Sequence, residues 1–490
     1  MQITIAMTAA AGGLAAVAAL ASQPESAPDW ADLARADIEA AHQLMLENHP
    51  GPIDVENPGF MAQAEQSLET ALELASRAAT EPGYVYALRA YGAGFRDGHF
   101  GIRAPLSADA PRQWAGLIVG WRADRFTVVD ADPETSLIGA ELVSCDGRAA
   151  ADMLIEDVFR FDSGKPDQPA YWARLAPRIL IDEGNPFAER ASACLFRAED
   201  GAETTEVLNW RAAPDDLAEL RRKATFGERP APSLREFAPG KFWINLPNFG
   251  PQTDDDVAAV RSVIEETAAR RPELRDADAI VADVRGNQGG SSAWGVQFAE
   301  ALWGEDYVSW RAPGRSEAVD WRASPGNIEH MDFVIGFLKD QGQVELAEEF
   351  AGPILDGMRE AHAEGREFFR ETSELDTAPR PDGPIENPVN ARVFFLTHGY
   401  CGSACLDFAD TMLSLEGVTH IGYPTASDTN YLEVRSVDLP SGRARLVIPI
   451  KVYRNRPRAN AEYYRPEIIY NGFDWSDAAM EDWVREAVLH

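Results

Sequence analysis

The sequence predicts an α/β protein, and two stretches carry this prediction. Residues 241–302 read as a short apolar strand, an amphipathic helix, a second apolar strand, a glycine-rich loop and another helix. Residues 392–410, RVFFLTHGYCGSACLDFAD, read as a buried strand, a tight turn and a helix. Strands and helices that alternate in this way form a mainly parallel sheet with functional loops at the strand ends.

Length and composition indicate a large globular protein with an acidic surface. The chain has 490 residues, of which 45% are hydrophobic and 25% are charged. This length fits about two or three domains. Acidic residues outnumber basic residues by 79 to 45, and the formal charge is −34. Such a surface disfavours binding to nucleic acid and to anionic membranes, because both need Lys and Arg partners.

Residues 1–21 are expected to be a signal peptide. An Ala-rich apolar run from Ala9 to Leu20 ends in a small-residue pattern before Ser22, which is typical of a cleavage site. No Lys or Arg precedes the run, so an unprocessed Ala-rich arm is the alternative. No other apolar stretch is long enough to span a bilayer. A signal peptide predicts a periplasmic or secreted protein, in which disulfides can form.

The remaining chain divides into four parts by its patterning and its Gly and Pro breaks. The expected parts are 22–105, a helical domain that ends in an Asp-Gly-His loop; 106–165, a small β module; 166–238, a β and linker region; and 239–490, the α/β core, which carries a charged helical insertion at 303–388.

The four cysteines are Cys145, Cys194, Cys401 and Cys405. No C-x-x-C pair occurs, so a structural zinc site is not expected, and no metal or cofactor is predicted. Cys401 and Cys405 flank Ser403. They either form a bridge across the turn or remain two buried thiols.

Ser403 and a glycine-rich loop are the first candidates for chemistry. Ser403 lies between a strand and a helix N-terminus, where unpaired backbone N–H groups can stabilise an oxyanion. An ordinary N-cap is the alternative role of such a serine. The loop DVRGNQGGSS follows another buried strand, and Gly289 and Gly290 would bring backbone N–H donors close to a substrate. The loop matches neither a dinucleotide fingerprint nor a P-loop, and a plain turn is its alternative.

A nucleophilic serine needs a base, and His99 is the candidate. His99 lies in a glycine-rich loop beside Asp97, a place that core packing does not require. His398 is near Ser403 in sequence, but it lies on the same turn and would have to point back at the serine. Asp97 is a second candidate to orient the base, although turn capping is its more usual role.

The order of these motifs resembles that of the S41 serine peptidases, the tail-specific and tricorn-type proteases. The motifs are D-G-H at Asp97–His99, D-x-R-G-N-x-G-G at Asp283–Gly290, G-S-A at Gly402–Ala404 and E-x-x-x-P-E-I at Glu462–Ile468. The resemblance covers most of the chain after about residue 30. It implies a ClpP/crotonase-like spiral core, and residues 117–153 loosely resemble the PDZ-like module of such proteins.

This resemblance implies roles for single residues. Ser403 matches the nucleophile, and the N–H of Ala404 with that of Gly289 or Gly290 matches the oxyanion hole. His99 and Glu462 match the histidine base and the late glutamate of the tricorn-type branch. One departure is Gly98, which stands where the closest tricorn pattern has a serine.

A lysine base is not favoured. Tail-specific members take a lysine from about two dozen residues beyond the serine, and here that window reads Ser427-Asp428-Thr429-Asn430. The next lysine, Lys451, lies far beyond it on an expected strand. The chain is therefore closer to the branch with a histidine base.

Together these observations predict an exported serine peptidase that cuts peptides or unfolded protein tails. The PDZ-like module would hold the substrate by strand addition and recognise its terminal carboxylate. One alternative is a catalytically silent ligand-binding protein on the same scaffold. Another is a crotonase-like acyl-CoA enzyme, although CoA phosphates need basic residues that this acidic chain does not favour. The sequence does not indicate an oligomeric state.

Overall fold

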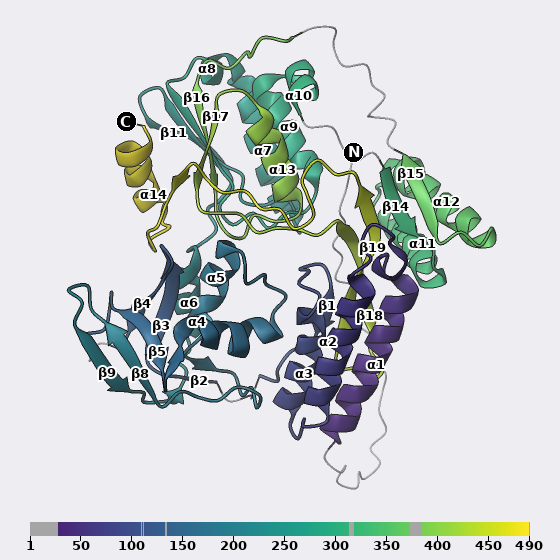
Figure 1. Ribbon diagram of the computed structural model, residues 1–490. Helices are drawn as coiled ribbons and strands as arrows, with labels where there is room; N and C mark the ends of the chain where they lie inside the picture. Colours follow the sequence, from purple (N-terminus) through teal and green to yellow (C-terminus); the bar gives the residue numbers. More distant parts are fainter. Residues whose placement is uncertain are drawn as a thin grey trace, which may run out of the picture.

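The computed structural model describes residues 28–108, 110, 112–132, 135–312, 318–372 and 384–489. The predicted signal peptide at 1–21 lies outside these residues. A helical bundle, a β module and an α/β core pack against one another (Figure 1). Within the described part of the chain, no helix combines the length and the apolar character needed to cross a membrane.

The N-terminal part forms three helices, which are α1 (Trp30–Asn48), α2 (Phe60–Ala75) and α3 (Glu81–Ala93). The predicted break at residues 49–52 is present, because α1 ends at Asn48 and a short turn follows. Asp29 and Thr80 cap α1 and α3 by accepting hydrogen bonds from backbone N–H groups of the first turn. These caps explain why the helices begin where they do.

The N-terminal helices share their core with a hairpin from the end of the chain. This hairpin consists of β18 (Tyr431–Asp438) and β19 (Arg445–Arg454), and β1 (Gly101–Arg103) pairs antiparallel with β19. Ile38, Tyr91 and Ile448 belong to one hydrophobic cluster. The helical part is therefore completed by residues more than 300 positions downstream (431 − 103 = 328).

The β module extends past the predicted boundary at residue 165. Its sheet has the strand order β3-β4-β5-β8-β9, with β6 paired to β5. The strands are β3 (Leu117–Arg122), β4 (Arg125–Ala131), β5 (Glu141–Cys145), β6 (Arg148–Ala149), β8 (Ala193–Arg197) and β9 (Glu203–Val207). A disulfide joins Cys145 to Cys194, which lie directly opposite each other on β5 and β8.

Short helices and a small sheet accompany this module. The helices are α4 (Ala150–Met153), α5 (Pro169–Leu175) and α6 (Leu217–Thr225), and the small sheet is formed by β2 (Gln113–Trp114), β7 (Ile181–Asp182) and β10 (Arg211–Ala212). Helices α5 and α6 contact β3.

The α/β core is a six-stranded sheet, as the alternating pattern predicts. Its order is β11-β12-β13-β16-β17-β20, and the strands from β12 to β20 run parallel. The strands are β11 (Ser233–Ala238), β12 (Lys241–Asn245), β13 (Ala279–Asp283), β16 (Arg392–Thr397), β17 (Val418–Gly422) and β20 (Ile468–Ile469). Because β13 and β16 are adjacent, with Asp283 opposite Leu396, the loops that follow them meet at one edge of the sheet.

Helices cover both faces of this sheet (Figure 1). The helices are α7 (Asp254–Ala269), α8 (Arg271–Arg275), α9 (Ser292–Trp303), α10 (Glu305–Arg311), α13 (Ala404–Ser414) and α14 (Asp477–Trp483). Val263 of α7, Phe298 of α9 and Phe408 of α13 pack on one face. Met480 of α14 packs on the other face, together with Ala173 of the module.

The insertion at 303–388 is not purely helical, contrary to the prediction. It contains α11 (Pro325–Asp340) and α12 (Gly352–Ala363), but also β14 (Ala318–Arg322) and β15 (Phe368–Thr372). The two strands pair with each other, and β14 also pairs with β19. Alternating residues such as Val319 and Trp321 pack against the insertion's helices, so the strand signal was present but short.

Replacing Asp37 should weaken the joint between the helices and the hairpin. Asp37 is fully buried and accepts hydrogen bonds from the Tyr84 hydroxyl at 2.6 Å and from the Ser441 N–H and hydroxyl at 2.9 and 2.6 Å. Asp37→Ala leaves these donors unpaired, so we expect a loss of about 2–4 kcal/mol in the free energy of unfolding. Urea denaturation followed by circular dichroism measures this loss. Asp32→Ala, at an exposed position of the same helix, should cost less than about 0.5 kcal/mol, and equal losses for both variants would contradict the prediction.

Candidate active site

Ser403 lies at a strained turn between β16 and α13. Its backbone angles are φ 55° and ψ −131°, in a region that residues with a Cβ rarely occupy. It is the N-cap of α13, yet its side chain makes no capping hydrogen bond. The ordinary role of an N-cap serine is therefore absent here, and the partly exposed hydroxyl is free for another one.

A disulfide between Cys401 and Cys405 spans the turn that contains Ser403. The two Cα atoms are 5.3 Å apart, and both cysteines are fully buried. Of the two states that the sequence allowed, the structure has the bridge. All four cysteines of the chain are in disulfides, since Cys145 and Cys194 form the other. The bridge restricts the backbone on both sides of the serine.

His398 joins the Ser403 turn to the glycine-rich loop instead of serving as a base. Its Nε2 accepts a hydrogen bond from the Gly286 N–H at 2.6 Å, and the ring is buried. Burial lowers the pKa of His398 to about 3, helped by the nearby charge of Arg285. The imidazole therefore stays neutral and structural.

The glycine-rich loop touches the serine directly, as the sequence predicts. Gly289 has φ 98°, and a Cβ at this position would lie 2.6 Å from the Ser403 Cβ and 2.9 Å from the Ala404 nitrogen. At Gly290, φ is 131° and a Cβ would lie 2.0 Å from the Phe249 oxygen. Only glycine allows this approach, because any side chain would collide with the turn.

Two of the three predicted oxyanion donors remain available. The Gly289 N–H donates to the Asn287 side-chain oxygen at 2.9 Å, so it is already engaged. Among the described residues, the N–H groups of Gly290 and Ala404 donate to no acceptor. Ala404, at the positive end of α13, and Gly290 therefore keep unpaired N–H groups.

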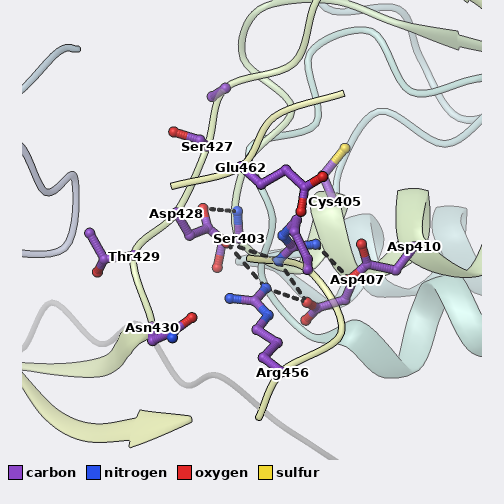
Figure 2. A network of polar contacts seen from close by, with 12 residues as sticks. Ser403, Cys405, Asp407, Asp410, Ser427, Asp428, Thr429, Asn430, Arg456 and Glu462 are labelled. Carbon is purple, nitrogen blue, oxygen red and sulfur yellow. Dashed lines mark hydrogen bonds and ion pairs between the residues drawn. The ribbon is translucent and has the colours of Figure 1, made fainter. Parts of the chain in front are cut away.

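Asp428 holds the Ser403 backbone in place (Figure 2). The Ser403 N–H donates to Asp428 Oδ1 at 2.9 Å. The other carboxylate oxygen lies 3.4 Å from the Arg458 guanidinium and 3.6 Å from that of Arg456. Sequence reasoning considered this position only as a place for lysine. The structure gives it another task, since its carboxylate fixes the serine's strained backbone.

The two arginines extend this contact into a buried ionic cluster. Arg456 and Arg458 also pair with Asp407 on α13, at 2.9 and 3.3 Å, and Arg458 pairs with Asp410 at 2.6 Å. Burial raises the pKa of Asp410 to about 6, although Arg458 opposes this shift. The cluster connects the first turns of α13 to the segment that carries Asp428 (Figure 2).

His99 and the buried Asp97 both lie on the loop that follows α3. Asp97 Oδ1 accepts the His99 backbone N–H at 2.9 Å, which is the turn-capping role, and lies 3.6 Å from the His99 Nδ1. Burial alone would lower the pKa of His99, but Asp97, and less strongly Asp428, raise it above the ordinary 6.5. Asp97 therefore has the turn-capping role, and its carboxylate lies beside the imidazole without a hydrogen bond to Nδ1.

The loop of His99 is tied to the segment that anchors Ser403. Asp97 Oδ2 accepts a hydrogen bond from the Thr429 hydroxyl at 2.8 Å, and Thr429 follows Asp428 directly. No hydrogen bond joins His99 to Ser403 in this structure. Such contacts are often open without substrate and tighten in the complex.

The segment of Glu462 also reaches the site. The Ala461 N–H donates to the Asp428 backbone oxygen at 2.8 Å. Glu462 itself is exposed and accepts the Ala459 N–H at 2.8 Å, so its present role is to shape this loop.

The module contributes a buried lysine that sequence reasoning missed. Lys165 Nζ lies 3.4 Å from the Ser427 backbone oxygen, and the Tyr171 hydroxyl donates to the same oxygen at 3.2 Å. Nothing in the local sequence marks Lys165, because its place follows from the packing of the module on the core. In the described part of the chain, no group of His, Cys, Asp and Glu is arranged to hold a metal ion.

Comparison with known proteins places the fold. No family model and no curated protein matches the chain. Among solved structures, mature CPAF in complex with lactacystin aligns with a TM-score of 0.59 at 15% identity, over 94% of this chain and 98% of that one. The photosystem II D1 C-terminal processing protease (TM-score 0.33, 13% identity, 91% and 98% coverage) and the tricorn protease (0.36, 11% identity, 93% and 37% coverage) are more distant. The chain therefore has the mixed α/β fold of the S41 protease CPAF.

The pKa of His99 can be measured directly. We expect its ring signal to titrate with a midpoint above 6.5, because Asp97 favours the charged imidazole. Asp97→Asn removes this charge, so burial should then bring the midpoint below 6.5. NMR of protein labelled with ¹³C-histidine gives both values. His49 is an internal control, since burial lowers its pKa to about 3, and a wild-type His99 midpoint at or below 6.5 would contradict the prediction.

Proposed function

We propose that this protein is a serine peptidase of the S41 type, which hydrolyses peptide bonds in peptides or unfolded protein tails. The main support is the Ser403 turn. Its hydroxyl is not used for capping, its backbone is strained, the N–H of Ala404 directly after it is unpaired, and so is that of Gly290 in the loop that contacts it. A nucleophile next to preorganised donors is the arrangement that acyl transfer needs.

In the proposed reaction, the Ser403 oxygen attacks the substrate carbonyl while His99 takes its proton. The negative oxygen of the tetrahedral intermediate accepts hydrogen bonds from Ala404 and Gly290. His99 then protonates the leaving amine, and a water molecule, deprotonated by His99, releases the acyl group from the serine. His99 must approach Ser403 for these steps, so we propose that substrate binding closes the gap between their loops. Because only neutral imidazole accepts a proton, the rate should rise with pH through a midpoint above 6.5.

Asp97 is better placed than Glu462 to orient the imidazole. It lies 3.6 Å from the His99 Nδ1, whereas Glu462 bonds to its own loop. A role for Glu462 therefore requires the same closure that brings His99 to the serine.

We also propose that the protein works in an oxidising compartment, the periplasm or the cell exterior. All its cysteines are in disulfides, and such pairs are rare in the reducing cytosol. An extended substrate could join the module at β9, which is the last strand of its sheet and is exposed along its whole length.

A fluorophosphonate probe tests the nucleophile and the base. We expect labelling at Ser403, located by peptide mass spectrometry, and none in Ser403→Ala. His99→Ala should slow labelling by at least about 10³-fold, because the serine loses its proton acceptor.

His362→Ala is the matched control, because His362 is an exposed histidine on α12 and should not affect labelling. Lys165→Met distinguishes the other nearby basic group. Loss of labelling in Lys165→Met with normal labelling in His99→Ala would reject histidine as the base. An unlabelled wild-type protein would instead favour the silent binding protein.

Asp428 should affect turnover more than substrate affinity. Asp428→Ala removes the acceptor of the Ser403 N–H, so the serine can leave its strained conformation. We expect kcat for a fluorogenic peptide to fall by about 10²-fold, with KM changed by less than about twofold. Asp438→Ala removes an exposed carboxylate from the hairpin and should change neither value. A larger change in KM than in kcat would show that Asp428 serves substrate binding.

A further inference from the structure

A cavity of about 440 Å³ lies between the N-terminal helices and the β module, next to the His99 loop. One wall is formed by residues 98 and 100–103, and another by residues 161–163. The first wall flanks His99, and the second ends two residues before Lys165, which contacts Ser427. Both walls are therefore adjacent in the chain to residues of the candidate active site. The volume is in the usual range of ligand pockets.

The charge of this cavity is opposite to that of the molecule. Its lining includes four arginines and two carboxylates: Arg89, Arg103, Arg178, Arg221, Asp162 and Glu183. The whole chain carries a formal charge of −34. A positively charged hollow on so acidic a protein selects anions, because negative groups are repelled elsewhere on the surface.

Two of the arginines form ion pairs with both carboxylates. Arg178 lies 3.3 Å from Asp162 and 3.6 Å from Glu183, and Arg221 lies 3.6 Å from Glu183. Glu183 has its pKa lowered despite its burial, because Arg178, Arg221 and Arg89 all face it. These two arginines and two carboxylates balance one another in charge, so the net positive charge of the cavity comes from Arg89 and Arg103.

The other two arginines form no ion pair among the described residues, although Arg89 faces Glu183 from beyond ion-pair distance. Arg103 is exposed at the end of β1 and forms no ion pair there. Arg89 lies over the Tyr86 ring, and its guanidinium reaches only the Ala104 oxygen, at 3.5 Å. Guanidinium groups match the planar fork of a carboxylate, and both of these remain available for one.

We propose that this cavity is a substrate subsite that binds a carboxylate of the peptide, through Arg103 and Arg89. The proposal rests on the proposed peptidase function, because the cavity adjoins the loop of the proposed base. Apolar residues such as Phe100, Ile102 and Phe161 line the same hollow, so the preferred peptide carries apolar residues beside its carboxylate. The carboxylate belongs either to an acidic side chain or to the chain terminus.

Binding to the inactive Ser403→Ala variant tests this proposal without turnover. The probes are pools of fluorescein-labelled decapeptides of Ala, Ser, Leu and Phe that contain either two glutamates or two glutamines, all amidated at the C-terminus. Fluorescence anisotropy should show about tenfold tighter binding of the glutamate pool. The difference should shrink as the salt concentration rises.

Two charge-reversal variants distinguish binding in the cavity from the effect of the protein's net charge. Arg103→Glu, in the Ser403→Ala background, should abolish the preference, and the milder Arg103→Ala should reduce it. Arg35→Glu makes the same change in net charge at an exposed site on α1 and should preserve the preference. Equal binding of the glutamate and glutamine pools, together with no gain in binding from a free C-terminus, would overturn the proposal, as would a preference that survives Arg103→Glu.

A third pool distinguishes the source of the carboxylate. Glutamine peptides with a free C-terminus that bind more tightly than their amides, with a difference that depends on Arg103, assign the cavity to the chain terminus. Failure of the peptidase proposal can be told apart from failure of the subsite proposal. If only the peptidase proposal fails, the wild-type protein leaves the glutamate pool uncut, but the binding preference measured by anisotropy persists.

Discussion

The candidate site depends on one hydrogen bond, from the Ser403 N–H to Asp428. A non-glycine residue in a strained conformation costs about 1–3 kcal/mol. A hydrogen bond to a charged group contributes about 1.5–3 kcal/mol, which is enough to offset that cost. The bond also engages the serine's own N–H, whereas the N–H groups of Ala404 and Gly290 stay unpaired. The Cys401–Cys405 bridge constrains the same turn from both sides. The strain is therefore held locally and does not rely on substrate.

The parallel sheet explains why the glycine loop meets this turn. β13 and β16 are neighbours in register, so the loops that follow them leave the sheet at the same edge. The approach is so close that a Cβ on Gly289 would lie 2.6 Å from the Ser403 Cβ. His398 then fixes the distance between the loops through the Gly286 N–H. Two segments more than 100 residues apart thus form one rigid unit, and its rigidity comes from backbone contacts.

This division between local and distant contacts also explains what the sequence could predict. The α/β core, Ser403 and the glycine loop follow from short patterns, in which each residue's neighbours in the chain are its neighbours in space. Asp428 could be read only as a missing lysine, because its partners Arg456 and Arg458 lie about 30 residues further on. Lys165 and the arginine cavity carry no local signal at all, since Lys165 lies where the module packs on the core and the cavity lies where the module meets the N-terminal helices. The strands within the insertion were missed because they are short and their partners are distant in the chain: β14 pairs with β19, and β15 pairs with β14 across the insertion's helices.

The ionic cluster around Asp428 is better explained by geometry than by stability. Removing several charges from water costs about as much as their pairing returns, so a buried cluster adds little net stability. The cluster instead fixes the orientation of α13 relative to the Asp428 segment, because Arg456 and Arg458 are shared between Asp428 and Asp407 of α13. The helix that begins at Ser403 and the segment that binds the His99 loop are thus oriented by the same two arginines. That segment bonds to the Ser403 backbone through Asp428 and to the His99 loop through Thr429 and Asp97. The placement of the proposed nucleophile and of the proposed base therefore depends on one anchored segment and on the packing of the domains around it.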